Sequence, residues 1–263
     1  MATEYLTNDI ELTSVADAIR AKSGQTGQLI YPDGFASAVA GIKKAPNTPY
    51  MVAEYEQELV TEYESASYIK KAKLYNHTRI AAYELAYQHL LQELDMSDPS
   101  NNITTIDANA FAYSMCENVI IPETVTLIGI TAFSSASIGT MILPGSVTRI
   151  SVFAFQGVRG VNDVAPVIKL NEGLAVIDQS AFNGAGIAGE IEIPSTVTEI
   201  GEYCFAYTGI TTVICKPTTP PALGTGAFTS DTAGFTIKVP AASVAAYKAA
   251  TNWSSYADYI VGV

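Results

Sequence analysis

The chain has 263 residues, of which 48% are hydrophobic and only 15% charged, and its net charge is −12. This composition is too apolar for a disordered chain, and the shortage of basic residues makes nucleic acid and anionic membranes unfavourable partners. Two histidines and three cysteines leave little for metal or thiol chemistry, so we expect no metal, no cofactor and no disulfide framework. No basic start followed by an apolar run and no long apolar stretch is visible, so we expect neither a leader nor membrane insertion.

Residues 1–44 predict two short helices. Apolar residues recur at helical spacing in Leu12–Ile19 and again in Asp33–Ile42, and Gly24 follows the end of the first. The string Leu12–Gly24, followed by Tyr31-Pro32-Asp33-Gly34-Phe35, resembles a short module of phage and prophage tail and baseplate-associated proteins. The resemblance implies an attachment module that binds other tail or virion proteins. A small helical hairpin of no fixed role is the alternative.

Residues 50–97 predict one long helix or a pair of helices divided near Asn76-His77-Thr78, because Met51–Leu94 contains no proline or glycine. An apolar seam of period 3.5 can be drawn along it, which favours a coiled-coil stalk and a homo-oligomer, with a trimer preferred. Packing of the helix against the first coil of the following region competes with self-association. The expected oligomerisation residues are Leu59, Ile69, Ile80, Tyr83, Tyr87 and Leu90.

Residues 103–240 are built from an internal repeat. The dipeptide Ala-Phe, once replaced by Cys204-Phe205, recurs at phenylalanine spacings of 22, 22, 27, 23 and 23 residues. An aliphatic residue stands four positions before each small residue, and a proline closes a short apolar run after most of the phenylalanines. Such self-similarity predicts a solenoid of six coils, since one coil cannot bury its own apolar edge. The phenylalanines are Phe111, Phe133, Phe155, Phe182, Phe205 and Phe228.

Each unit contains two β-branched segments, Val-Thr-x-Ile and Ile-x-Ile-Pro, that predict short strands flanking the Ala-Phe dipeptide. These residues resemble the leucine-rich repeats of the bacterial surface-antigen (BspA-like) class. That class reads Ile-Pro-x-x-Val-Thr-x-Ile-Gly-x-x-Ala-Phe, which Ile121–Phe133 and Ile193–Phe205 match nearly throughout. The resemblance implies a cell-surface, host-contact or phage-associated binding protein and no enzymatic activity.

Two further segments depart from the repeat. An insertion, Gly157–Pro166, lengthens one coil and predicts a loop that is either part of a binding face or a tolerated surface bulge. Residues 241–263 predict a short helix that, with Trp253, covers the open edge of the last coil.

No catalytic arrangement can be assembled from the sequence. His77 and His89 are too far apart to act together on one helix face, the carboxylates of the repeats are scattered, and Cys204 takes the place of a core alanine.

Alternate positions of the strands before each proline point outward and form the candidate partner-binding surface, and the insertion adds two charged residues to it. The register near Cys215 leaves Ile214 ambiguous. The candidate residues are Ile120, Ile142, Lys169, Glu192, Lys238, Arg159 and Asp163.

Together these features predict an α+β chain with a helical N-terminal region, a leucine-rich-repeat solenoid of about six coils and a helical C-terminal cap. We expect a phage or prophage tail protein, assembled in the bacterial cytoplasm, that binds a protein or glycan receptor on a bacterial surface. The alternatives are a bacterial surface or secreted adhesin and a structural virion subunit.

Overall fold

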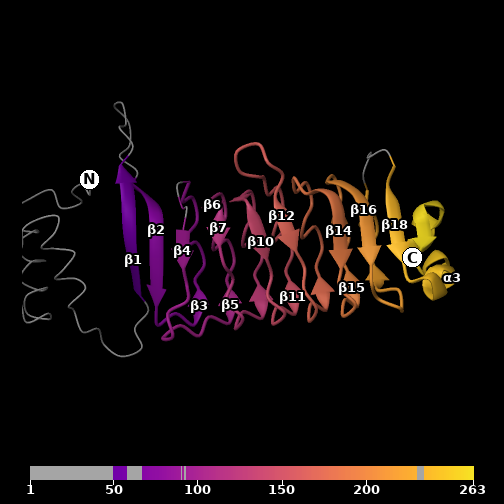
Figure 1. Ribbon diagram of the computed structural model, residues 1–263, viewed down its shortest axis with the longest axis horizontal. Helices are drawn as coiled ribbons and strands as arrows, with labels where there is room; N and C mark the ends of the chain where they lie inside the picture. Colours follow the sequence, from indigo (N-terminus) through magenta and orange to yellow (C-terminus); the bar gives the residue numbers. More distant parts are fainter. Residues whose placement is uncertain (1–49, 58–66, 90, 92, 230–233) are drawn as a thin grey trace, which may run out of the picture.

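The computed structural model describes residues 50–57, 67–89, 91, 93–229 and 234–263 (Figure 1). These residues form a β-solenoid of about eight turns that ends in a short helix. The solenoid is therefore longer than the six coils expected, and strands rather than helices begin it. The attachment module expected over residues 1–44 lies outside the described residues.

One side of the solenoid is a parallel sheet of seven two-residue strands in the order β17-β15-β13-β11-β8-β5-β3. The last residue of each strand is the aliphatic residue of the repeat, and in-register pairing stacks Ile106, Ile128 and Ile150 in one buried column. The strands are β3 (Arg79–Ile80), β5 (Thr105–Ile106), β8 (Leu127–Ile128), β11 (Arg149–Ile150), β13 (Val176–Ile177), β15 (Glu199–Ile200) and β17 (Ala222–Leu223).

A second side includes the strands that precede the repeat prolines. They form the sheets β1-β2-β4-β7, β10-β12 and β14-β16-β18-β19, and β6 pairs with β9 beside them; β1 is Tyr50–Gln57 and β2 is Ser67–Tyr75. Their bounds are β4 (Glu93–Asp95), β6 (Met115–Cys116), β7 (Asn118–Val119), β9 (Ser137–Ile138), β10 (Thr140–Ile142), β12 (Val167–Lys169), β14 (Ala188–Ile193), β16 (Gly209–Cys215), β18 (Thr236–Val239) and β19 (Ile260–Gly262).

The Ala-Phe dipeptides lie in turn segments that join these two sides. The N–H of Phe111 donates to the carbonyl of Ala132 in the next coil at 2.7 Å, and the same bond recurs from Phe133 to Ala154. The residues two before and two after these phenylalanines have left-handed backbone, with φ of 52–58° around Phe111 and Phe133. This alternation directs every second N–H along the solenoid axis, so the turns are hydrogen-bonded between coils as a sheet would be.

Six phenylalanine rings stack inside these turns. Neighbouring rings are parallel within 6° and their centroids lie 4.8–5.7 Å apart. All six side chains are buried. Small residues precede the rings because the coils approach closely there: Ala110 and Cys204, for example, are 0% exposed. The same closeness explains the repeat glycine, since a Cβ on Gly201 would lie 2.3 Å from the backbone nitrogen of Gln179.

The long helix predicted over residues 50–97 is wrong. Strands β1 (Tyr50–Gln57) and β2 (Ser67–Tyr75) form an antiparallel hairpin, and β2 continues the sheet through parallel pairing with β4. Residues rich in tyrosine, valine and isoleucine suit strands as well as helices, and pairing with the solenoid decides between them. The sequence favours a helix here only because, without proline or glycine, it shows no turn between the two strands.

Residues 76–97 form a first coil that the repeat template did not reveal. Leu85 takes the place of the core phenylalanine, and its N–H donates to the Ala110 carbonyl at 2.9 Å. The expected oligomerisation residues that the structure describes therefore do not share a helix face. Ile80 is buried in the core, Tyr83 and Tyr87 are exposed, Ile69 lies in β2, and Leu59 and Leu90 lie outside the described residues.

The expected cap is present at the C-terminal end. It comprises η1 (Ala241–Ser243), α3 (Val244–Ala249) and η2 (Trp253–Tyr259), after which β19 pairs with β18. Trp253 is fully buried and donates from Nε1 to the Pro221 carbonyl at 2.8 Å. The Tyr247 hydroxyl donates to the Pro217 carbonyl at 2.8 Å, and burial raises the pKa of this phenol. The cap thus satisfies carbonyls of the last coil as well as covering its apolar residues.

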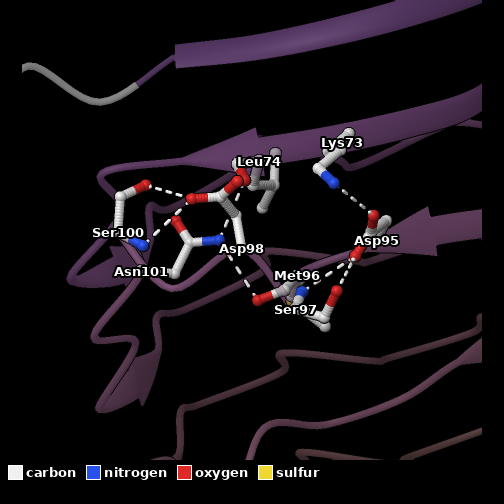
Figure 2. A network of polar contacts seen from close by, with 8 residues as sticks. All are labelled: Lys73, Leu74, Asp95, Met96, Ser97, Asp98, Ser100 and Asn101. Carbon is white, nitrogen blue, oxygen red and sulfur yellow. Dashed lines mark hydrogen bonds and ion pairs between the residues drawn. The ribbon is translucent and has the colours of Figure 1, made fainter.

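A polar network joins the N-terminal hairpin to the first coil (Figure 2). Asp95 accepts hydrogen bonds from the Ser97 hydroxyl at 2.6 Å and backbone N–H at 2.8 Å, and its carboxylate lies 3.0 Å from Lys73 Nζ in β2. Asn101 donates to the carbonyls of Leu74 and Met96. Hydrogen bonds from Ser97 and the Lys73 charge lower the pKa of Asp95 to about 2.

This network predicts an acid-dependent contribution of Asp95 to stability. A lowered pKa stabilises the fold above the ordinary value of 3.8, and that contribution disappears as pH falls through about 2. The melting temperature of the wild type should therefore exceed that of Asp95→Asn at pH 6, and the difference should shrink as pH falls and disappear below about pH 2. A difference that does not change with pH would contradict this assignment.

The phenylalanine stack predicts a large effect of one truncation. Phe155→Ala should lower the free energy of unfolding by about 3–5 kcal/mol, because it opens a cavity between two neighbouring rings. Urea denaturation followed by far-UV circular dichroism measures the change. Ile130→Ala, at a side chain that is 53% exposed, is the control and should change it by less than about 0.5 kcal/mol.

Candidate binding surface

Five of the expected binding residues form a row along the strand side of the solenoid, and all five occupy outward positions. Ile120 follows β7 and is 81% exposed, whereas Ile142 in β10 is 53% exposed. Strand alternation explains this, since their neighbours Ile121, Met141 and Leu143 are buried. The row consists of Ile120, Ile142, Lys169, Glu192 and Lys238, and the register of β14, β16 and β18 places Ile214 between Glu192 and Lys238.

Two of the three charged residues of this row, Glu192 and Lys238, are in ion pairs. Lys216 Nζ lies 2.5 Å from Glu192 and 4.0 Å from Glu172, and Lys238 Nζ lies 3.7 Å from Glu190. The hydrogen bond with Glu192 raises the pKa of Lys216. These ion pairs are half exposed to water and contribute little to stability. They leave the apolar half, around Ile120 and Ile142, as the more distinctive surface.

The insertion is a small hairpin beside that apolar half, and it rises beyond the strands near β12 in Figure 1. Val161 and Val164 form an antiparallel bridge, and the turn residues Asn162 and Asp163 have φ of 53° and 61°. Such a pair of left-handed residues is typical of a tight two-residue hairpin. Gly160 is required there, because a Cβ would lie 1.5 Å from the Val164 carbonyl oxygen.

The insertion leads into β12, which pairs with the strand that carries Ile142. Val164, at the hairpin, is 67% exposed, and Val167 in β12 pairs with Thr140 in the strand that carries Ile142. We define the apolar patch as Ile120, Ile142, Val164 and Val167. Arg159 is exposed and its backbone bonds to Ala136 and Ile138, so it lies beside β9 rather than in the row. Asp163 is exposed at the hairpin turn.

Exposed tyrosines on the turn segments form a second surface that the sequence reasoning missed. Tyr87, Tyr113 and Tyr207 stand two residues after the core position of their coils, with φ of 57–61°, and Tyr83 and Tyr203 stand two residues before it, with φ of 61° and 51°. Gly157 and Gly184 fill the equivalent position of other coils. A bulky residue in this conformation costs on the order of 1–3 kcal/mol, and an exposed side chain does not offset that cost by burial. The signal was visible in the repeat as tyrosine where other coils carry glycine.

Two of these tyrosines are in contact with each other. The rings of Tyr87 and Tyr113 stack 5.2 Å apart with an angle of 3° between their planes. About half of each side chain is nevertheless exposed. The pair presents a flat aromatic surface that the coil-to-coil hydrogen bonds hold in place.

Several of the histidine, cysteine and acidic side chains considered for chemistry are buried or held by neighbouring groups. His77 is buried, with Nδ1 2.9 Å from the Tyr75 carbonyl and Nε2 2.8 Å from Glu84, and burial raises the pKa of the thiols of Cys204 and Cys215. A surface depression is lined by Asp178, Glu199 and Glu202, but Asp178 is held bidentately by Arg149.

Within the described residues, no group of three histidine, cysteine or acidic side chains could hold a metal ion, and no helix is long and apolar enough to cross a bilayer.

Comparison with known families agrees with this geometry. The model of the BspA type leucine-rich repeat region matches six copies across residues 63–162 and 165–248, which is well over half of the chain. The chain belongs to this family. The match includes the first coil that the sequence reasoning took for helix, and it includes none of residues 1–44, so the resemblance to phage tail proteins gains no support. Among curated proteins, no sequence matches this chain.

Family membership indicates the general class of function. BspA-type repeats suggest a surface-binding or adhesin-type protein, and such solenoids are typical of non-enzymatic binding proteins. The isoleucines of the row and the tyrosines of the turns are exposed, whereas the aliphatic and phenylalanine positions of the repeat are buried in the stack.

The strained tyrosines yield a stability prediction. Tyr207→Gly should leave the free energy of unfolding unchanged or raise it by up to about 1 kcal/mol, because glycine adopts φ of 57° without strain. Urea denaturation measures the change. Gly184→Ala is the reverse control: open space surrounds its Cβ position, so the expected loss of about 1 kcal/mol would come from backbone strain alone. A loss in Tyr207→Gly larger than in Gly184→Ala would show that the tyrosine stabilises the fold.

Proposed function

We propose that this BspA-type protein is an adhesin-type recognition protein that binds a protein on a bacterial surface through the apolar patch. The observation that supports the proposal is the exposure of large aliphatic side chains on neighbouring coils, with Ile120 at 81% and Ile142 at 53%. Exposed apolar side chains gathered on a rigid sheet beside polar residues mark a protein contact more often than a solvated surface.

The surroundings of the patch suit a docking role. Lys169 pairs in register with Ile142, and the paired charges of Glu192 and Lys238 continue the same side of the solenoid. An apolar centre with a polar rim is the usual anatomy of a protein interface. The strand backbone holds the patch in one geometry, so little conformational entropy is lost when a partner binds.

The proposal is tested by binding of the fluorescently labelled full chain to bacterial cells. Ile142→Asp should weaken binding at least about tenfold, because it places a charge at the centre of a desolvated contact. Ile130→Asp is the matched control, since Ile130 is also an isoleucine at 53% exposure but lies on a turn segment. Treatment of the cells with protease should abolish the binding that Ile130→Asp retains.

Equal binding by Ile142→Asp and Ile130→Asp would overturn the proposal, as would binding that survives protease. The phage-tail placement and the structural virion role remain alternatives within the same class of binding function. Incorporation of the chain into purified particles distinguishes them: a structural subunit would be incorporated and would require the apolar patch for that incorporation, whereas a receptor-binding subunit would be incorporated with Ile142→Asp as well.

A further inference from the structure

We propose that Tyr83, Tyr87 and Tyr113 form a second binding site, which takes a neutral saccharide. The site lies on the turn segments of the first two coils, whereas the apolar patch lies on the strands and the insertion hairpin. It is therefore independent of the protein contact proposed above, and either proposal can fail without the other.

The first argument is the accessible aromatic surface. Tyr87 and Tyr113 stack in parallel at 5.2 Å, yet their side chains remain 54% and 48% exposed, and Tyr83 is 61% exposed. The next residue in the row after Tyr113 is Ser135, which has no ring to continue the stack. An aromatic face is thus open beside a short polar side chain. Sugar rings place their C–H faces on such aromatic surfaces, since the face of an aromatic ring is apolar and electron-rich.

The second argument is preorganisation. The N–H of Tyr87 donates to the Ala112 carbonyl and that of Tyr113 donates to the Ser134 carbonyl, both at 2.9 Å. Both tyrosines adopt the left-handed conformation that glycine occupies in other coils of the same row. A fixed backbone lowers the entropy lost on binding.

The third argument is the absence of free charge in these turns. The four segments 81–88, 107–114, 129–136 and 151–158 contain no lysine or arginine and only two carboxylates. Both carboxylates are engaged: Glu84 by His77 Nε2 and the Ala81 N–H, and Asp107 by Arg79 at 3.3 Å and the Thr105 hydroxyl at 3.1 Å. A phosphorylated or otherwise ionic ligand would find no counter-charge in these segments.

The polar groups of these turns also favour a saccharide as the ligand. Asn109 and Thr131 lie in the neighbouring row and are joined by a 2.8 Å hydrogen bond that fixes their orientation, and Ser135 follows Tyr113. Hydroxyl and amide groups around an aromatic face suit the hydroxyls of a sugar.

Affinity electrophoresis of the full chain in gels that contain mannan, xylan, β-glucan or amylose tests the proposal, with the anionic polysaccharide alginate as a comparison. At least one neutral polysaccharide should retard the wild type. Tyr87→Gly and Tyr113→Gly should each weaken that retardation at least tenfold. Both substitutions suit the left-handed backbone, and far-UV circular dichroism confirms that the variants are folded.

Two control variants make the result specific. Tyr207→Gly makes the same change at the same row position four coils away and should bind the polysaccharide as the wild type does. Ile142→Asp, which disrupts the apolar patch, should also retain polysaccharide binding. The proposal is overturned if no neutral polysaccharide retards the wild type, if alginate alone does so, or if Tyr87→Gly and Tyr113→Gly behave like Tyr207→Gly.

Discussion

The structure depends on the hydrogen bonds that join one turn segment to the next. Outside the turns the coils are connected by strands of only a few residues, many of them two residues long, which alone would make a weak sheet. In the turns, the N–H of every core phenylalanine from Phe111 to Phe205 donates to a carbonyl of the next coil at 2.7–2.8 Å. These bonds bring the coils close enough for the rings to stack, so the backbone pattern and the aromatic core stabilise each other.

Because neighbouring coils must approach closely, each repeat carries a small residue before its phenylalanine. This regularity is what made the coils predictable from the sequence. Where Ala-Phe recurs, spacing alone identified the coils, their core residues and the outward positions of Ile120 and Ile142. Prediction failed in residues 50–97 for two reasons. Glu84-Leu85 stands where other coils have Ala-Phe, so the first coil does not match the repeat, and no glycine or proline marks the hairpin. The pairing of β1 with β2 and the pairing of β2 with β4 are long-range choices that local propensity does not decide.

The tyrosine rows illustrate a different limit of sequence reasoning. Tyr83 and Tyr87 were assigned to a helical seam by their spacing, and nothing in the dipeptide Ala-Phe shows that the residues two positions away have left-handed backbone. Alignment of the coils on their core position makes the rows visible, since Tyr87 and Tyr113 then coincide with Gly157 and Gly184. Glycine in a repeat can therefore reveal where a bulky residue of another coil is strained.

The stacked core also separates the stability of the solenoid from its surface chemistry. Because each coil satisfies its backbone through its neighbours, the outward residues of strands and turns can vary without changing the core. Ends are the exception, since a terminal coil exposes unpaired backbone groups. The chain covers the C-terminal end with Trp253 and Tyr247, which bond to carbonyls of the last coil, and extends the N-terminal end with a hairpin tied to the first coil through Asp95 and Lys73. Between these ends, the strand side with the apolar patch and the turn side with the tyrosines can vary separately, and that independence would allow one small solenoid to carry the two recognition surfaces that we propose.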